Sequence, residues 1–168
     1  ISIMQPPGTY RVSVVSEGVS STKELEVIKD PHSEGTLNDI MMQNELVEKI
    51  YNDLNVTAKH VNTIESVRRQ LLDLKSGLSG GNMSIDLIKE VDDLENKFLD
   101  LEKKLLQLKI TGKGQDAVRY EKMIGEKLSY LAQNVQISDF RPADSYYEVY
   151  DLLHKRLEDV GTQLKTLV

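Results

Sequence analysis

The most constraining feature of the sequence is a heptad repeat of apolar residues in its second half. From Leu87 to Leu108 the apolar positions step by four and three residues in alternation. The members of this repeat are Leu87, Val91, Leu94, Phe98, Leu101, Leu105 and Leu108. This spacing places all of these side chains on one side of an α-helix, so it predicts a stripe that is buried against other helices.

Similar apolar stripes extend over most of the chain after residue 36. We expect helices at 37–78, 84–110, 115–136 and 142–168. Their predicted core positions outside the heptad are Leu37, Ile40, Met41, Val47, Ile50, Leu54, Val61, Ile64, Val67, Leu71, Leu74, Leu78, Val118, Ile124, Leu128, Leu131, Val135, Tyr150, Leu153, Leu157, Val160, Leu164 and Leu167. Short connections favour antiparallel neighbours. The sequence therefore predicts a mainly helical fold, with an up-down-up-down four-helix bundle over residues 33–168.

Capping residues indicate where two of these helices begin. Ser33 or Thr36 is expected to cap the first helix, with Asp39 as the partner of Thr36 in a capping box. The fourth helix starts either near Pro142, since proline suits a first helical turn, or through a capping box in the SYYE stretch at 145–148.

Glycine-rich and polar stretches indicate where helices end or bend. The glycines of SGLSGGNMS, residues 76–84, suit the end of the first helix, and Ser84 is expected to cap the second. TGKGQD, residues 111–116, is interpreted as a flexible turn, because it lacks the spacing and the preceding strand of a phosphate-binding loop. A bend is expected at NDLNVT, residues 52–57, which is rich in poor helix formers.

Ahead of the helices, residues 8–31 have the pattern of a β-hairpin. Apolar and polar side chains alternate in residues 9–15, SEGVSS supplies a turn, and the alternation resumes with Leu25 and Val27. An isolated two-stranded hairpin is only marginally stable in water. We therefore expect the hairpin either to rest on the overhanging first turns of the first helix or to belong to a sheet whose other strands lie elsewhere.

Composition disfavours several functions. The net charge of −6 argues against nucleic acid and against anionic membrane surfaces, since both require a clustered excess of lysine and arginine. The sequence has no cysteine, which removes disulfides, thiolate nucleophiles and cysteine-based metal sites. No apolar run reaches the length of a membrane span.

The histidines offer few candidates for chemistry. His32, His60 and His154 stand in no recognised metal-binding pattern, and the sharpest pair is Asp151 with His154, three residues apart on one helix. Metal sites in helical bundles need several carboxylates that converge from different helices. We therefore predict no catalytic residue, no bound cofactor and no metal site in this chain.

Acidic residues of the second helix are a further candidate. Asp92 and Glu95 share a helical face to which Glu90 and Glu102 also belong. Paired carboxylates can act in acid–base chemistry when burial raises one pKa. Because the heptad occupies the opposite side, we interpret this face as solvent-exposed and stabilised by i,i+4 ion pairs. Arg68 is likewise expected on a solvated face.

Aromatic residues gather at the start of the fourth helix. Tyr146, Tyr147 and Tyr150 follow Phe140 closely in the sequence. Such a cluster could form a binding surface, because aromatic residues are enriched at interfaces. It could equally close the end of the bundle or pack under the hairpin. We favour packing, because tyrosine suits sites where the ring is buried and the hydroxyl group stays in contact with water.

The opening stretch PPGTYRVSVVSEGVSSTKELEVIKDP resembles the last two strands of an Ig-like or fibronectin-like sandwich. More specifically, it resembles a junction in large secreted bacterial proteins built on a sortilin-like β-propeller with BNR-type repeats, often labelled glycosyl hydrolases. The motif residues present are Pro6, Pro7, Gly8, Thr9, Tyr10, Val27, Asp30 and Pro31, with His32 where arginine is common. RRQL at 68–71 and RPADSYYEVYDLL at 141–153 are similar to the helical region that follows in that family.

This resemblance implies that residues 1–32 are the remnant of a β-sandwich domain and that the bundle is a non-catalytic C-terminal domain. The expected partners are the rest of a parent chain, another protein, or a second copy bound through the hairpin edge, and the expected location is periplasmic or extracellular. The propeller lies outside these residues, so no catalytic residue is carried over. Two alternatives remain: a coiled-coil oligomerisation or adaptor module, and a metal-dependent enzyme lodged in the bundle.

Overall fold

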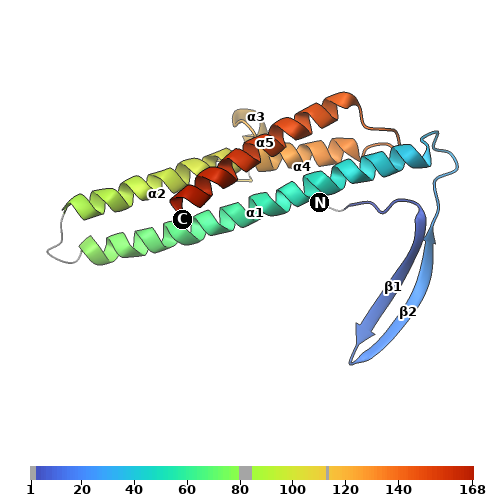
Figure 1. Cartoon of the computed structure of the whole chain (residues 1–168), viewed down its shortest axis with the longest axis horizontal. Helices are drawn as coiled ribbons and strands as arrows, with labels where there is room; N and C mark the ends of the chain where they lie inside the picture. Colours follow the sequence, from blue (N-terminus) through green and yellow to red (C-terminus); the bar gives the residue numbers. More distant parts are fainter. Residues whose placement is uncertain (1–2, 80–84, 113) are drawn as a thin grey trace.

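The computed structural model describes residues 3–79, 85–112 and 114–168. Its elements are β1 (Gly8–Ser16), β2 (Val19–Val27), α1 (Leu37–Ser79), α2 (Ile85–Leu105), the single turn α3 (Asp116–Arg119), α4 (Ile124–Val135) and α5 (Asp144–Leu167). α1, α2, α4 and α5 pack on one another, and the hairpin projects from their side (Figure 1). The predicted fold class is confirmed: the protein is mainly helical, with an N-terminal antiparallel hairpin followed by four packed helices.

α1 is the longest element and lies beside the three other long helices (Figure 1). Its 43 residues span about 65 Å. α2 covers the C-terminal half of α1, where Arg68 binds Glu95, and α4 covers the N-terminal half, where Gln43 binds the carbonyl oxygen of Val135. α2 and α4 therefore follow one another along α1, and both run antiparallel to it.

α5 runs parallel to α1. Asp53 of α1 binds His154 of α5, and one heptad further along both helices His60 lies against Gly161. The predicted alternation of direction therefore holds from α1 to α2 and from α4 to α5, whereas the chain continues from α2 into α4 without reversing. Along most of its length, α5 therefore packs beside α1 and beside either α2 or α4.

The connection between α2 and α4 is longer than predicted, because between residues 106 and 123 the single turn α3 is the only helical segment among the described residues. α2 ends at residue 105 rather than 110, and α4 begins at residue 124 rather than 115. The carboxylate of Glu126 accepts hydrogen bonds from the backbone N–H groups of Gln107 and Met123, at 3.0 and 2.9 Å. One side chain thereby holds the end of α2 against the start of α4.

The predicted turn at 111–116 is confirmed for its described residues, which exclude Lys113. Gly112 and Gly114 have φ angles of 74° and 66°, in the region that glycine adopts without strain. The backbone N–H and the hydroxyl of Thr111 both donate to the carboxylate of Asp116 at 2.7 Å, which closes the turn.

The capping box predicted at the start of α1 is confirmed. The N–H of Thr36 donates to Asp39 Oδ2 at 2.9 Å, and the N–H of Asp39 donates to Thr36 Oγ1 at 3.1 Å. α1 then continues without interruption through residues 52–57 and past Gly77. Of the other expected turn and cap residues, Gly80, Gly81 and Ser84 lie outside the described residues.

The start of α5 differs from both predicted versions. The helix begins at Asp144, and its N-cap residue is Ala143, which offers no side-chain hydrogen bond. Pro142 therefore precedes the helix, and Ser145 lies inside its first turn. An ion pair between Arg141 and Asp144, at 3.1 Å, spans this boundary at the surface.

The core contains most of the predicted stripes. In α2, Val91, Phe98, Leu101 and Leu105 are buried, whereas Leu87 and Leu108 at the two ends of the heptad are exposed. The stripe of α5 is buried from Tyr150 to Leu164. Predicted core residues that are instead exposed are Leu37, Met41, Leu74 and Val118. Leu37 lies in the first turn of α1, and Val118 lies in α3, which stands outside the packed helices (Figure 1).

Glu90 is exposed as predicted, but the three other α2 carboxylates that we expected to face solvent bind α1 instead. Arg68 donates to Glu95 at 2.8 Å and to Glu102, whose exposed fraction is only 4%. Burial alone would lower the pKa of Arg68, but its hydrogen bonds to the two carboxylates raise it above the ordinary value. Asp92 likewise pairs with Lys75 of α1. These contacts cross between helices, so the predicted i,i+4 arrangement is wrong for these residues.

The hairpin does not rest on the helices. β1 and β2 pair in one antiparallel register from Gly8 opposite Val27 to Ser16 opposite Val19. Apart from Val27, which lines a hollow with Ile40 and Gln43 of α1 at the base of the hairpin, the strands lie away from the described helices, so the prediction that the hairpin lies on the first turns of α1 is wrong. Its base is held near the bundle by a hydrogen bond from the N–H of Met4 to Gln136 Oε1, at 3.2 Å.

Gly35, just before α1, is a position where the fold tolerates no side chain. A Cβ atom there would lie 2.2 Å from the carbonyl oxygen of Asp139, in the connection between α4 and α5. Gly35→Ala should therefore lower the free energy of unfolding by about 2 kcal/mol or more, measured by urea denaturation. Gly77→Ala is the matched control, because nothing lies within 4 Å of its added Cβ. It should be neutral or stabilise α1 by up to about 1 kcal/mol, and a Gly35→Ala protein of unchanged stability would contradict this packing.

Candidate functional site

A cluster of titratable side chains lies where α1 meets α5. Asp53 has an exposed fraction of 6%, and its Oδ2 lies 2.8 Å from Nδ1 of His154. The ring of Tyr150 stacks on the imidazole, with centroids 5.5 Å apart and planes 27° apart. The other imidazole nitrogen, Nε2, lies 3.8 Å from Oε1 of Glu158. These four residues form the Asp53 cluster.

The environment of the Asp53 cluster changes the acidity of Tyr150. Burial, together with the negative charge of Asp53 and a hydrogen bond to that carboxylate, raises the pKa of the Tyr150 phenol to about 12. The more distant charges of Asp151 and Glu158 act in the same sense. Tyr150 is therefore a neutral hydrogen-bond donor at physiological pH, which suits a partner of a buried carboxylate.

The Asp53 cluster has part of the arrangement of a hydrolytic triad. A carboxylate at Nδ1 orients an imidazole, as in serine hydrolases, but catalysis also needs a nucleophile at Nε2. At Nε2 the described residues place the exposed carboxylate of Glu158 instead. Within residues 3–79, 85–112 and 114–168, no group of three or more histidine or acidic side chains is positioned to hold a metal ion. The cluster as described acts as a hydrogen-bonded link between α1 and α5.

The sequence did not indicate which acidic residue binds His154. Asp151, which precedes it on the same helix, is exposed, whereas the partner in the structure is Asp53, far away in the sequence. A signal for Asp53 was present: it follows Ile50 by three residues and precedes Thr57 by four, so it occupies a position of the buried stripe of α1. A charged residue in such a position predicts a buried polar contact.

The other two histidines are separate from the Asp53 cluster. His60 is half-buried against Gly161, and a Cβ atom on that glycine would lie 3.0 Å from His60 Nε2. Burial, and secondarily the positive charge of Lys165, lower the pKa of His60. His32 is exposed, and its backbone N–H donates to Asp30 at 2.8 Å.

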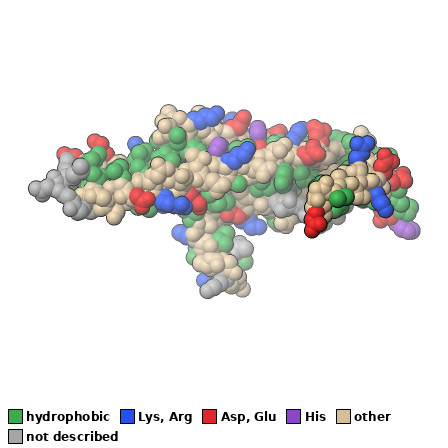
Figure 2. All heavy atoms as spheres, turned by 90° about the horizontal axis from the view of Figure 1, so that it is seen from below, with side chains coloured by type: hydrophobic (Ala, Val, Ile, Leu, Met, Phe, Trp, Pro, Cys, Tyr) green, Lys and Arg blue, Asp and Glu red, His purple; other side chains and the backbone are tan. Residues whose placement is uncertain are grey.

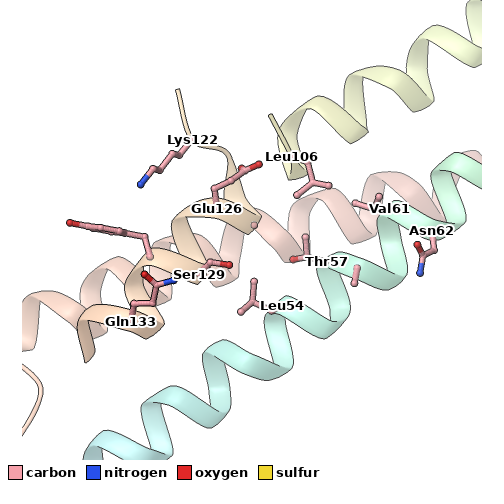
Figure 3. A pocket seen from close by; sticks show the side chains of 12 residues that line it. Leu54, Thr57, Val61, Asn62, Leu106, Lys122, Glu126, Ser129 and Gln133 are labelled. Carbon is pink, nitrogen blue, oxygen red and sulfur yellow. The ribbon is translucent and has the colours of Figure 1, made fainter. Parts of the chain in front are cut away.

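An open groove of about 510 Å³ lies between α1 and α4 (Figure 3). Leu54, Thr57 and Val61 of α1 form one wall, and Ser129 and Gln133 of α4 face them (Figure 3). Its surface is mainly apolar. The carboxylate in its lining, Glu126, already accepts two backbone hydrogen bonds. The groove therefore has the mainly apolar lining that is typical of a binding surface.

A second groove, of about 460 Å³, lies between α4 and α5. Its apolar lining includes Tyr130, Val149 and Leu152, whose exposed fractions are 57%, 44% and 50%. Figure 2 shows another aspect of the surface, on which acidic and basic side chains are interspersed along the helical body.

The aromatic cluster predicted at the start of α5 is divided between core and surface. Tyr150 is buried and Tyr146 and Tyr147 are half-buried against the core, so packing dominates, as expected. Phe140 is 54% exposed and does not join them in the core. Because the strands lie away from the described helices, the aromatic side chains at the start of α5 do not pack under the hairpin.

These features define a class: a helical bundle protein with an exposed hairpin and open apolar grooves. No family model matches the chain, and comparison with curated proteins and with solved structures gives no match. The resemblance to the propeller-associated helical regions therefore stays a prediction. None of the described helices combines the length and the apolar character needed to cross a membrane.

Tyr150 should make the protein lose stability at alkaline pH. Its pKa in the folded protein is about 12, against 10.0 for an ordinary tyrosine, so the unfolded chain loses this proton first as pH rises. The stability that the protonated Tyr150 phenol contributes to the folded protein is fully present below about pH 10 and is lost between pH 10 and 12. Urea denaturation across this range should show a steeper loss for the wild-type protein than for Tyr150→Phe. The control Tyr130→Phe, which alters an exposed ring, should behave as the wild type does, and identical pH profiles for all three proteins would contradict the assignment.

Proposed function

We propose that the chain is a non-catalytic structural and interaction domain of a larger protein, in which the hairpin completes the β-sheet of a neighbouring domain. The observation that supports this proposal is the exposed apolar face of the hairpin. The helical bundle then serves as a rigid support that holds the two strands at the edge of that domain.

The strand register places most apolar side chains of the hairpin on one face, and Val15 lies on the other. The mainly apolar face contains Tyr10, Val12, Val14, Val19, Leu25 and Val27, together with Lys23 opposite Val12 and Ser21 opposite Val14. Val14 and Val19 have exposed fractions of 64% and 73%. On the opposite face Arg11 stands across from Glu24, and the hydroxyls of Ser13 and Thr22 form a hydrogen bond of 2.7 Å. Sheets with one apolar and one polar face bury the apolar face against a second layer.

The nature of that second layer follows from the resemblance described above. The hairpin has the motif residues of the last two strands of a sandwich in secreted propeller proteins, and the helical region follows in the same order. A sandwich would cover the apolar face with its second sheet and would pair the free edges of β1 and β2 with its own strands. A periplasmic or extracellular location belongs to this proposal and rests on the resemblance alone.

The alternative function is an oligomerisation or adaptor module. Free hairpin edges favour it, since two copies could pair strand to strand. The heptad of α2 does not favour it, because Val91, Phe98, Leu101 and Leu105 are already buried inside one chain. Sedimentation separates the two: an obligate oligomer without a folded monomer supports the adaptor function and contradicts the leading proposal.

Hydrogen exchange tests the leading proposal directly. In the isolated chain, amides of β1 and β2 should exchange much faster than those around Ile64 in α1, because a hairpin without a second layer is marginally stable. In a polypeptide extended by the residues encoded upstream of Ile1, protection of the strand amides should rise by a factor of about 100 or more. Strand amides that are equally exposed in both proteins would contradict the proposal, as would a stop codon shortly before Ile1.

Two valines provide a matched pair of variants. Val14 lies on the apolar face and Val15 on the polar face, and their exposed fractions are 64% and 71%. Val14→Ser should reduce strand protection in the extended polypeptide, since it removes a buried apolar side chain, whereas Val15→Ser should have little effect. Neither should alter the urea midpoint of the helical bundle. Equal effects of the two substitutions would show that the apolar face is not covered.

A further inference from the structure

We infer that the groove between α4 and α5 is a docking site for an acidic amphipathic helix from a protein partner. This groove is distant in sequence from the hairpin, and the inference goes beyond the proposed function.

The shape of the groove fits a third helix. On α4, Tyr130 and Leu131 line it, and on α5, Val149 and Leu152 line it, so its floor and walls are apolar side chains of two adjacent helices. α4 has 12 residues, which corresponds to about 18 Å, or roughly three turns of a bound helix. A helix in such a groove anchors apolar residues at i, i+3, i+4 and i+7.

The charge of the groove identifies the partner. Lys122, Lys127 and Arg156 lie along its rim, and of the described residues that line it none carries a carboxylate. The chain as a whole has a net charge of −6, so this local excess of positive charge opposes the overall balance. The ammonium group of Lys122 lies 4.3 Å from the centre of the Tyr130 ring, where it borders the apolar surface. Carboxylates flanking an apolar stripe would complement this rim.

The ion pair that Lys127 forms within the chain does not prevent this lysine from attracting an acidic partner. Lys127 pairs with Glu121 at 2.8 Å, and the charge of Arg156 also acts on that carboxylate, which is 74% exposed. Exposed ion pairs contribute little stability, so a carboxylate of the partner can replace Glu121 at small cost. An anionic membrane is the other surface that basic and apolar residues could bind. The negative charge of the whole chain and the concave shape of the groove between two helices favour the helix.

The test uses the complete chain and a synthetic probe. The probe is a fluorescein-labelled helical peptide of about 18 residues, with leucines at i, i+3, i+4 and i+7 and glutamates flanking them. A control peptide has lysine in place of every glutamate. Fluorescence anisotropy should show saturable binding of the acidic peptide that weakens as salt is added, and binding of the basic peptide at least about tenfold weaker.

Two pairs of variants locate the binding. Leu152→Asp and Arg156→Glu should each weaken binding of the acidic peptide by a factor of about ten or more, the first by placing a carboxylate on the apolar wall and the second by reversing the rim charge. Leu72→Asp and Lys155→Glu are the matched controls, since both residues are exposed and neither lines the groove. Circular dichroism checks that all four variants remain folded. Arg156 is exposed, so its variant preserves the test if Leu152→Asp fails to fold.

Three outcomes would overturn the inference. The first is equal affinity for the acidic and basic peptides or no saturable binding of the acidic one. The second is loss of binding in the control variants to the same degree as in the groove variants. The third is binding to vesicles with about 30% anionic phospholipid while the acidic peptide does not bind, which would assign the groove to a lipid surface.

Discussion

The structure depends on polar contacts that α1 makes along its buried side. Gln43 holds the end of α4 through the carbonyl oxygen of Val135, Asp53 holds α5 through His154, and Arg68 holds α2 through its carboxylates. Apolar stripes alone allow neighbouring helices to slide by a repeat, because leucine packs against leucine at each step. A buried polar group without its partner costs about 1–3 kcal/mol. Each of these residues therefore fixes one helix at one position along α1.

The arrangement of α2 and α4 creates the open surfaces of the protein. Because α2 ends at residue 105 and α4 begins only at residue 124, α4 continues along α1 where a reversed helix would have packed beside α2. α4 is short, and grooves lie on both of its sides, one facing α1 and the other facing α5. Tyr130 and Lys122 border both grooves. The surfaces most suited to a partner are thus consequences of how the second and third long helices are joined.

The hairpin and the helices differ in how they are stabilised. The bundle buries its apolar residues within the chain, and its buried side-chain nitrogen and oxygen atoms in the described residues all have hydrogen-bond partners. The hairpin has a complete ladder of backbone pairs but leaves its apolar face uncovered. Such a contrast is expected when one part of a chain is complete and another is half of a packed layer. It supports a role in which the helices carry and orient the strands.

The sequence by itself determined the features that depend on neighbours along the chain. The heptad of α2, the capping box of Thr36 and Asp39, the turn at 111–116 and the presence of the hairpin all follow from local spacing and backbone preference. Only the tertiary structure decided that Asp53 rather than Asp151 binds His154, that Glu102 is buried against Arg68, and that α4 runs parallel to α2. These features join residues far apart in the sequence, and local patterns carry no information about which distant partner satisfies a buried polar group. For the same reason, the alternation of apolar and polar residues revealed an apolar face on the hairpin. It could not reveal that the helices leave this face uncovered.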